Sequence, residues 1–112
     1  MELIEWQDFE KVELRVGTIV SAEVNESAKK SAYVLNVDFG SEIGLKKTSA
    51  QITDLYSIDN LIGKQVVGVV NFPPKQIGKM ISEVLITGFP DEEGRVVLIS
   101  PDIRVANGAK LF

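Results

Sequence analysis

The chain has 112 residues, a formal net charge of −4 and 45% hydrophobic residues, and it contains neither cysteine nor histidine. This length suits one domain with a buried core and is too short for two, so we expect a single domain over residues 1–112. The missing thiols and imidazoles exclude disulfides, cysteine nucleophiles, histidine bases and the usual zinc sites. No paired acids stand in an apolar setting either, so we expect a binding protein without catalysis, metal or cofactor.

The first residues carry no basic region and no long apolar stretch, so they do not resemble a secretion signal. An apolar run such as residues 65–71 is far shorter than the roughly 18 residues that a membrane span needs. We expect a cytoplasmic protein with no membrane insertion.

Charge is unevenly distributed along the chain. Residues 1–26 hold seven acidic and two basic residues, a balance of −5. Residues 29–79 hold seven lysines and four acidic residues, a balance of +3. A basic centre within an acidic chain is compatible with one face for nucleic acid. The alternative is a scatter of unrelated surface lysines, and charge alone does not decide between them.

In chain order, residues 6–9 predict a short helical turn with Trp6 and Phe9 on one side. Residues 12–24 are apolar at the even positions except at Thr18, which predicts a long strand whose even face is buried. We expect this strand to bend at Gly17. A polar loop over residues 25–31 follows.

The second strand is predicted over residues 33–39, with one apolar face made of Tyr33, Leu35, Val37 and Phe39. Residues 40–42 form a turn into a third strand at residues 43–47. Residues 48–64 break the β pattern and show a loose helical spacing that ends at Gly63.

The fourth strand, residues 66–72, is apolar on both faces, which is typical of a central strand, and two prolines end it. Residues 75–81 are predicted as a loop, and strands follow at residues 83–87 and 96–99. The acidic cluster at residues 91–94 is predicted as a solvated turn, and a further turn signal is Asn107-Gly108.

Short strands with glycine-rich turns predict a sandwich or a barrel. Five main strands with one helix between the third and the fourth are the arrangement of the OB fold. The predicted fold is therefore an all-β, five-stranded Greek-key barrel with short N- and C-terminal extensions.

Two polar stretches at strand ends are candidates for binding residues. The first is residues 46–51, whose lysines, hydroxyls and amide suit phosphates and bases; the alternative is a solvated strand end with Ser49 as a helix N-cap. The second is residues 71–83, where Gly78 lets a ligand approach the backbone between two lysines. Asn71 and Ser82 bracket this second stretch and are candidates for a hydrogen bond across its neck; the alternative role is to hold the loop closed without contacting a ligand.

Three motifs, in order along the chain, resemble the tRNA-binding OB domain. That domain is attached to methionyl- and tyrosyl-type tRNA synthetases and also occurs as free-standing dimers. The motifs are Val12-Glu-Leu-Arg-Val-Gly-Thr-Ile-Val20, Thr48-Ser-Ala-Gln-Ile-Thr53, and Val70-Asn-Phe-Pro-Pro through Ser82-Glu-Val-Leu85. The likeness runs from about Asp8 to Lys110, and the third motif is most similar to the CsaA branch, the export-related chaperones.

The resemblance implies a barrel that dimerises through its terminal extensions and binds tRNA at the loop between its fourth and fifth strands. With the two polar stretches, it predicts an RNA site made of Lys46, Lys47, Ser49, Gln51, Asn71, Lys75, Lys79 and Ser82. The synthetase-linked form has Lys-Met-Arg-Gly where this chain has Gln76-Ile77-Gly78-Lys79, so we expect fewer phosphate contacts.

The CsaA branch implies an alternative function, a molecular chaperone that binds unfolded or export-precursor polypeptides. Such a chaperone needs an exposed apolar groove, for which the candidates are Phe72, Ile77, Met80 and Ile81.

Apolar residues in the two end segments also predict a homodimer, because a monomer would expose them to water. These residues are Trp6, Phe9, Ile103, Val105, Leu111 and Phe112.

Overall fold

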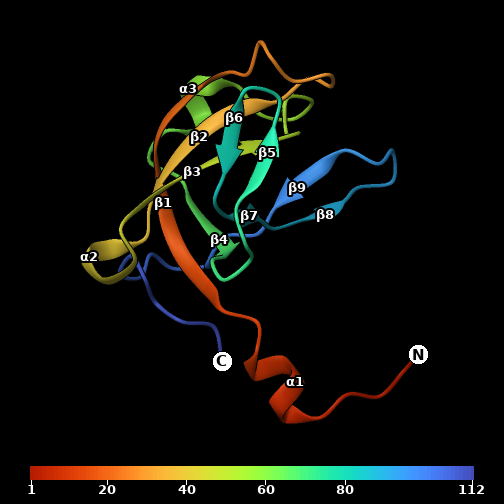
Figure 1. Cartoon of the computed structure of the whole chain (residues 1–112), viewed down its shortest axis with the longest axis vertical. Helices are drawn as coiled ribbons and strands as arrows, with labels where there is room; N and C mark the ends of the chain where they lie inside the picture. Colours follow the sequence, from red (N-terminus) through yellow and green to blue (C-terminus); the bar gives the residue numbers. More distant parts are fainter.

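The computed structural model describes residues 1–112 and is built around a five-stranded antiparallel sheet that curls into a barrel (Figure 1). The strands of this sheet, in the spatial order β3-β2-β1-β4-β7, are β3 (Leu45–Ala50), β2 (Tyr33–Asp38), β1 (Leu14–Val24), β4 (Gln65–Val69) and β7 (Leu85–Ile86). The Glu83 N–H donates to the Lys47 carbonyl at 2.7 Å, so the sheet edges meet and the barrel is nearly closed. One short helix, α3 (Ile58–Leu61), lies between β3 and β4, which confirms the predicted OB-type arrangement.

The core follows the predicted alternation along β2. Leu35, Val37 and Phe39 are completely buried, because successive residues of a strand point to opposite faces and these share the inner one. They form one cluster with buried residues of other elements, among them Ile19, Leu61 and Val66.

The long strand β1 exists as predicted, but the two odd positions Gly17 and Ile19 are buried in its first half, together with Thr18. Ile19 is fully buried, whereas Val20 is 46% exposed and Val24 is 58% exposed. The pairing of β1 with β2 shifts register between Ile19 and Ser21, so a β-bulge lies at Val20. One extra residue exchanges the inward and outward positions along a strand, so the prediction of one buried even face over the whole strand is wrong. Ile19 points inward before the bulge, and Ala22 packs against the core after it.

Gly17 is not the bend point of β1. A Cβ atom at this position would lie 2.6 Å from Val37 Cγ1 and 2.8 Å from Phe39 Cδ1, both in the core. Gly17 therefore makes room for the Phe39 ring, and the irregularity sits three residues further along the strand.

The C-terminal tail adds to the sheet along the start of β1. Leu111 N–H donates to the Leu14 carbonyl at 2.9 Å, and Val16 N–H donates to the Ala109 carbonyl at 3.0 Å. The β1–β2 ladder begins only at Thr18, so the preceding residues of β1 have a free edge that the tail fills.

The third strand is displaced toward the C-terminus relative to the prediction. A helical turn, α2 (Gly40–Ile43), precedes it, and β3 continues to Ala50 with Thr48 only 1% exposed. Ser49 is thus a strand residue and caps no helix. The cap of α3 is Ser57, whose Oγ accepts a hydrogen bond from the Asn60 N–H at 3.4 Å.

β4 is buried at all five positions, as predicted for a strand with neighbours on both sides. Residues 75–81, predicted as a loop, instead belong to a hairpin of β5 (Lys75–Ile77) and β6 (Met80–Ser82) that turns at Gly78. A second hairpin, β8 (Gly88–Pro90) with β9 (Val96–Leu98), follows β7. Strands of three residues are too short to show a period in the sequence, so the first hairpin was missed.

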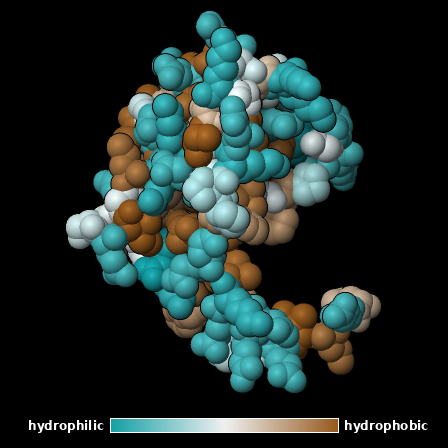
Figure 2. Space-filling model, viewed as in Figure 1, coloured by the Kyte–Doolittle hydropathy of each residue, from teal (hydrophilic) through white to brown (hydrophobic).

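Residues 1–13, before β1, form an N-terminal arm. It contains the predicted helical turn, α1 (Trp6–Glu10), in which the ring centroids of Trp6 and Phe9 lie 5.2 Å apart. The arm leads away from the barrel, and Figure 2 shows an open space between the two. None of the helices has the length and apolar composition required to cross a membrane.

Candidate nucleic-acid interface

Hairpin β5–β6 borders two cavities. The first, which we call the proline groove, has a volume of about 550 Å³ and is lined by Thr48, Ser49, Phe72, Pro73, Pro74, Lys75, Ile77, Ser82, Val84 and Leu85. The second, which we call the lysine cavity, has a volume of about 480 Å³ and is lined by Glu23, Val24, Asn25, Glu26, Ser27, Val34, Lys47, Lys79 and Met80. Lys75, Ile77 and Ser82 of the hairpin line the first cavity, and Lys79 and Met80, at and next to its tip, line the second.

The proline groove is mainly apolar. Phe72 is 54% exposed and Leu85 is 51% exposed, so two large hydrophobic side chains face solvent beside the two prolines. Lys75 is the only cation in the lining. Exposed apolar surface next to one positive charge suits a stacked base or an apolar side chain.

The lysine cavity is polar. Lys47 from β3 and Lys79 from the hairpin tip supply two ammonium groups, and Glu23 and Glu26 supply two carboxylates. A phosphate entering this cavity would be attracted by the lysines and repelled by the acids. The affinity of the cavity for the phosphate therefore depends on how close the phosphate lies to each of these side chains.

The hydroxyls near the hairpin base are engaged within the protein. Ser82 Oγ lies 2.8 Å from Thr48 Oγ1, and Ser49 Oγ accepts a hydrogen bond from Asn25 Nδ2 at 3.0 Å. A hydroxyl has one donor and two acceptor positions, so the Ser49 O–H still has a proton to donate to a ligand.

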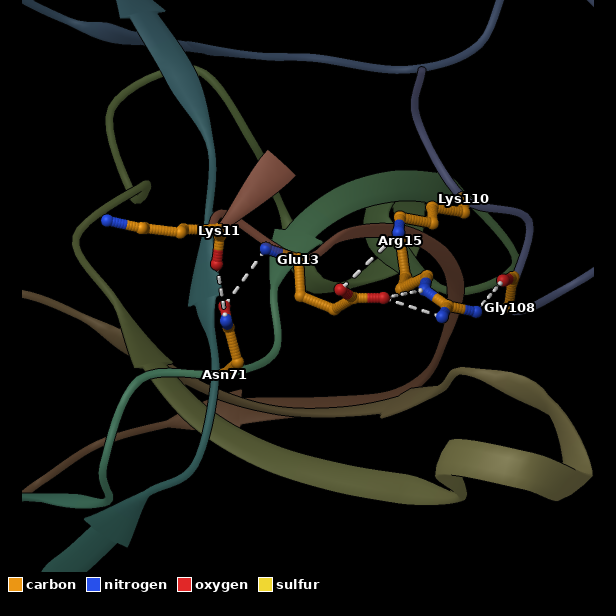
Figure 3. A network of polar contacts seen from close by, with 6 residues as sticks. All are labelled: Lys11, Glu13, Arg15, Asn71, Gly108 and Lys110. Atoms are coloured by element: carbon orange, nitrogen blue, oxygen red, sulfur yellow. Dashed lines mark hydrogen bonds and ion pairs between the residues drawn. The ribbon is translucent and has the colours of Figure 1, made fainter. Parts of the chain in front are cut away.

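The side chain of Asn71 makes its hydrogen bonds to the backbone between α1 and β1 (Figure 3). It makes none to Ser82. Its Oδ1 accepts a hydrogen bond from the Glu13 N–H at 3.0 Å, and its Nδ2 donates to the Lys11 carbonyl at 2.7 Å. The hydrogen bond between Asn71 and Ser82 does not form, because the backbone before β1 occupies both the oxygen and the nitrogen of the Asn71 amide. That prediction is wrong.

Next to Asn71, an ion cluster joins β1 to the C-terminal tail (Figure 3). Arg15 donates to Glu13 Oε1 from Nε at 2.9 Å and from Nη2 at 2.6 Å, and its Nη1 donates to the Gly108 carbonyl at 2.9 Å. Lys110 Nζ lies 3.7 Å from Glu13 Oε2. The hydrogen bond from Arg15 is the main cause that lowers the pKa of Glu13, and Lys110 adds to the effect.

Comparison with known proteins shows the family to which the chain belongs. A family model described as "Putative tRNA binding domain" matches residues 14–110. The chain belongs to this tRNA-binding domain family. The resemblance found in the three motifs is thereby confirmed over nearly the whole chain.

The chain is similar both to whole chains of known structure and to a part of a ligase. The crystal structure of the chaperone CsaA from Bacillus anthracis superposes with a TM-score of 0.92 at 44% identity, over 99% of this chain and 100% of that one. A MetRS related protein from Pyrococcus horikoshii superposes with a TM-score of 0.87 at 31% identity, over 100% of both chains. A methionine–tRNA ligase from Flavobacterium psychrophilum is 39% identical over 110 residues, which are 96% of this chain and 15% of the ligase. The chain thus spans 15% of the length of that ligase.

Five of the eight predicted site residues line the two cavities of this tRNA-binding-type domain. Lys47 and Lys79 line the lysine cavity, and the proline groove receives Ser49, Lys75 and Ser82. The remaining ones, Lys46, Gln51 and Asn71, line neither cavity. Lys46 pairs with the fully buried Val37, so it starts from the inner face of β3, opposite to Lys47. Gln51 is exposed one residue beyond the end of β3.

Two residues of the lysine cavity, Asn25 and Ser27, were not predicted as site residues. They lie in the polar loop between β1 and β2, and asparagine and serine there signal local hydrogen-bonded turns. The loops between strands 1 and 2 and between strands 4 and 5 both bind ligands in OB folds. That rule could have directed attention to Asn25 and Ser27.

Proposed function

We propose that this chain is a non-catalytic module that binds tRNA along hairpin β5–β6, with Lys47, Lys75 and Lys79 as the phosphate contacts. The observation that carries the proposal is the placement of Lys47, from β3, and Lys79, from the turn of the hairpin, in one cavity. The hairpin follows the fourth strand of the barrel, the position at which OB folds bind oligonucleotides. The family model supports tRNA as the class of nucleic acid.

The affinity for tRNA is expected to be weak. Gly78 stands where the synthetase-linked form has an arginine, and a Cβ atom at this position would lie 2.5 Å from Ser27 Oγ. Glu23 and Glu26 also offset the two lysines of the lysine cavity. Fewer uncompensated cations release fewer counterions on binding, so both the affinity and its dependence on salt are smaller.

Binding of a tRNA transcript to the full chain and to the double variant Lys75→Ala, Lys79→Ala tests the proposal. Each lost phosphate contact should flatten the slope of log affinity against log salt concentration by about 0.7 to 0.9. Lys46→Ala is the control for the loss of a single lysine charge, because it removes one positive charge from the opposite face of β3. Equal affinity and equal slope in the parent and the double variant would exclude this face as the tRNA site.

We further propose that residues 1–112 work as one domain in the cytoplasm and form a homodimer. Both end segments expose large hydrophobic side chains: Trp6 is 63% exposed, Ile103 76% and Phe112 100%. Hydrophobic surface on the arm faces the open space beside the barrel in Figure 2, where a second copy could bury it.

A second candidate function is the binding of unfolded or export-precursor polypeptides in the proline groove. The exposed Phe72 and the half-buried Ile77 line this groove, and a relative of known structure is a CsaA chaperone. Met80 lies in the lysine cavity instead, and Ile81 lines neither cavity. Peptide binding at an apolar groove should change little with salt, whereas tRNA binding should weaken with a slope of about 0.7 to 0.9 for each phosphate contact, so one salt titration separates the two functions.

A further inference from the structure

We propose that Ser27 and Asn25 are positioning residues of the tRNA site, which hold the tip of hairpin β5–β6 so that Lys79 stays in the lysine cavity. This inference rests on the proposed function and adds to it two residues that carry no charge. The evidence is a chain of hydrogen bonds that leads from the barrel, through the β1–β2 loop, to the hairpin tip.

At the tip, the Lys79 N–H donates to Ser27 Oγ at 3.0 Å, across 52 positions of the sequence. The Ser27 hydroxyl in turn donates to Asn25 Oδ1 at 2.9 Å, and the Ser27 N–H donates to the same oxygen at 3.2 Å. The Ser27 hydroxyl is thus donor and acceptor at once, and its direction is set by the asparagine.

The turn at Gly78 is shaped for this contact. Gly78 has φ of +64°, a conformation that residues with a side chain rarely adopt, and it approaches Ser27 so closely that a Cβ atom would lie 2.5 Å from Ser27 Oγ. Gly78 stands where the synthetase-linked form has an arginine. Because it has no side chain, the tip of the hairpin can contact the β1–β2 loop at Ser27.

Asn25 connects the docked tip to the rigid part of the fold. It is only 8% exposed, its Nδ2 donates to Ser49 Oγ on β3 at 3.0 Å, and its N–H donates to the Ala32 carbonyl at 2.9 Å. A buried amide whose partners are all in place keeps one orientation, because any other would leave polar groups without partners.

The base of the hairpin has a separate attachment. Ser82 Oγ lies 2.8 Å from the hydroxyl of Thr48, which is 1% exposed, and Lys75 pairs with Ser82 across the hairpin. Loss of the Ser27 hydroxyl should therefore free the tip and Lys79 but leave the base and Lys75 in place.

A held lysine binds a phosphate more tightly than a mobile one, because less conformational freedom is lost on binding. The number of charges is the same in both cases, so counterion release is also the same. A positioning role thus predicts a loss of affinity without a change in salt slope, unlike the loss of a lysine.

A double-mutant cycle on the full-length chain, with one fluorescently labelled tRNA transcript as the probe, tests the role of Ser27. Ser27→Ala should weaken binding by about three- to tenfold with an unchanged salt slope. In the Lys79→Ala background the same substitution should have no further effect, whereas in the Lys75→Ala background it should keep its full effect. Thermal unfolding of each variant confirms that it is folded.

The free protein offers an independent measurement, the amide hydrogen exchange of Lys79. In Ser27→Ala this N–H loses its acceptor, so its exchange should become faster while the amides of β3 stay protected. Unchanged Lys79 exchange, or a Ser27→Ala penalty of equal size in the Lys79→Ala background, would overturn the positioning role and leave the proposed function standing. Lysine variants with unchanged affinity and salt slope would overturn the proposed function and the positioning role with it.

Discussion

Asn71 and Glu13 are 58 positions apart in the chain, yet Asn71 Oδ1 accepts the hydrogen bond of the Glu13 N–H at 3.0 Å (Figure 3). Asn71 Nδ2 binds the Lys11 carbonyl as well, so one side chain satisfies a backbone donor and a backbone acceptor. The exit of β4, from which the chain continues to hairpin β5–β6, is thereby fastened to the segment between α1 and β1.

We expect Asn71→Ala to act on stability and not on phosphate contacts. The loss of two exposed hydrogen bonds should lower the free energy of unfolding by about 1 kcal/mol. Proteolysis before β1 should become faster, and the salt slope of tRNA binding should stay the same, because an amide releases no counterion. Chemical denaturation and limited proteolysis measure these effects. A flatter salt slope in this variant would contradict the structural role given to Asn71.

Glu13 should contribute to stability in a pH-dependent way. The pKa of Glu13 is lowered in the folded state, chiefly by the hydrogen bond from Arg15. A carboxyl whose folded pKa lies below its unfolded pKa stabilises the fold above the unfolded value, about 4.3, and loses that effect as the pH falls through the folded value. Glu13→Gln should therefore lower the urea midpoint at pH 7 and have a diminishing effect below pH of about 4. An equal effect at pH 7 and at pH 3 would show that the ion cluster does not act through the charge of Glu13.

Gly17→Ala should destabilise the barrel, because the new methyl group would meet Val37 and Phe39 at less than 3 Å. Overpacking of this kind lowers the free energy of unfolding by about 1–3 kcal/mol. The penalty should be smaller in the Val37→Ala background, where the shorter side chain leaves space for the methyl group. Chemical denaturation of the four proteins measures both values, and a neutral Gly17→Ala would be incompatible with the observed packing.

The end segments should form the interface of a homodimer. Sedimentation equilibrium at micromolar concentration should show a dimer, and Trp6→Ser or Phe112→Ser should each raise its dissociation constant by about tenfold or more. Phe89→Ser is the matched control, since Phe89 is 65% exposed on the β8–β9 hairpin, outside both end segments. A monomer at these concentrations, or an equal effect of all three substitutions, would exclude this interface.

Local patterns in the sequence determined the fold class, five main strands, the helix between β3 and β4, and the buried face of β2. They succeeded because the side-chain period of a strand and the turn chemistry of glycine and proline are properties of neighbouring residues. The three motifs in order resemble the tRNA-binding OB domain, and the family model over residues 14–110 confirms this resemblance.

Tertiary structure alone decided the partners of residues far apart in the chain. The bulge at Val20 exchanges the inward and outward positions part-way along β1. The pairing of β1 with β2 shows this bulge, whereas the alternation of apolar residues in the sequence of β1 gives no sign of it. The tail fills an edge that exists only because β2 begins to pair at Thr18. Asn71 and Ser27 both take backbone partners more than 50 positions away, so the folded chain, and not their neighbours in sequence, sets which hydrogen bonds these side chains make.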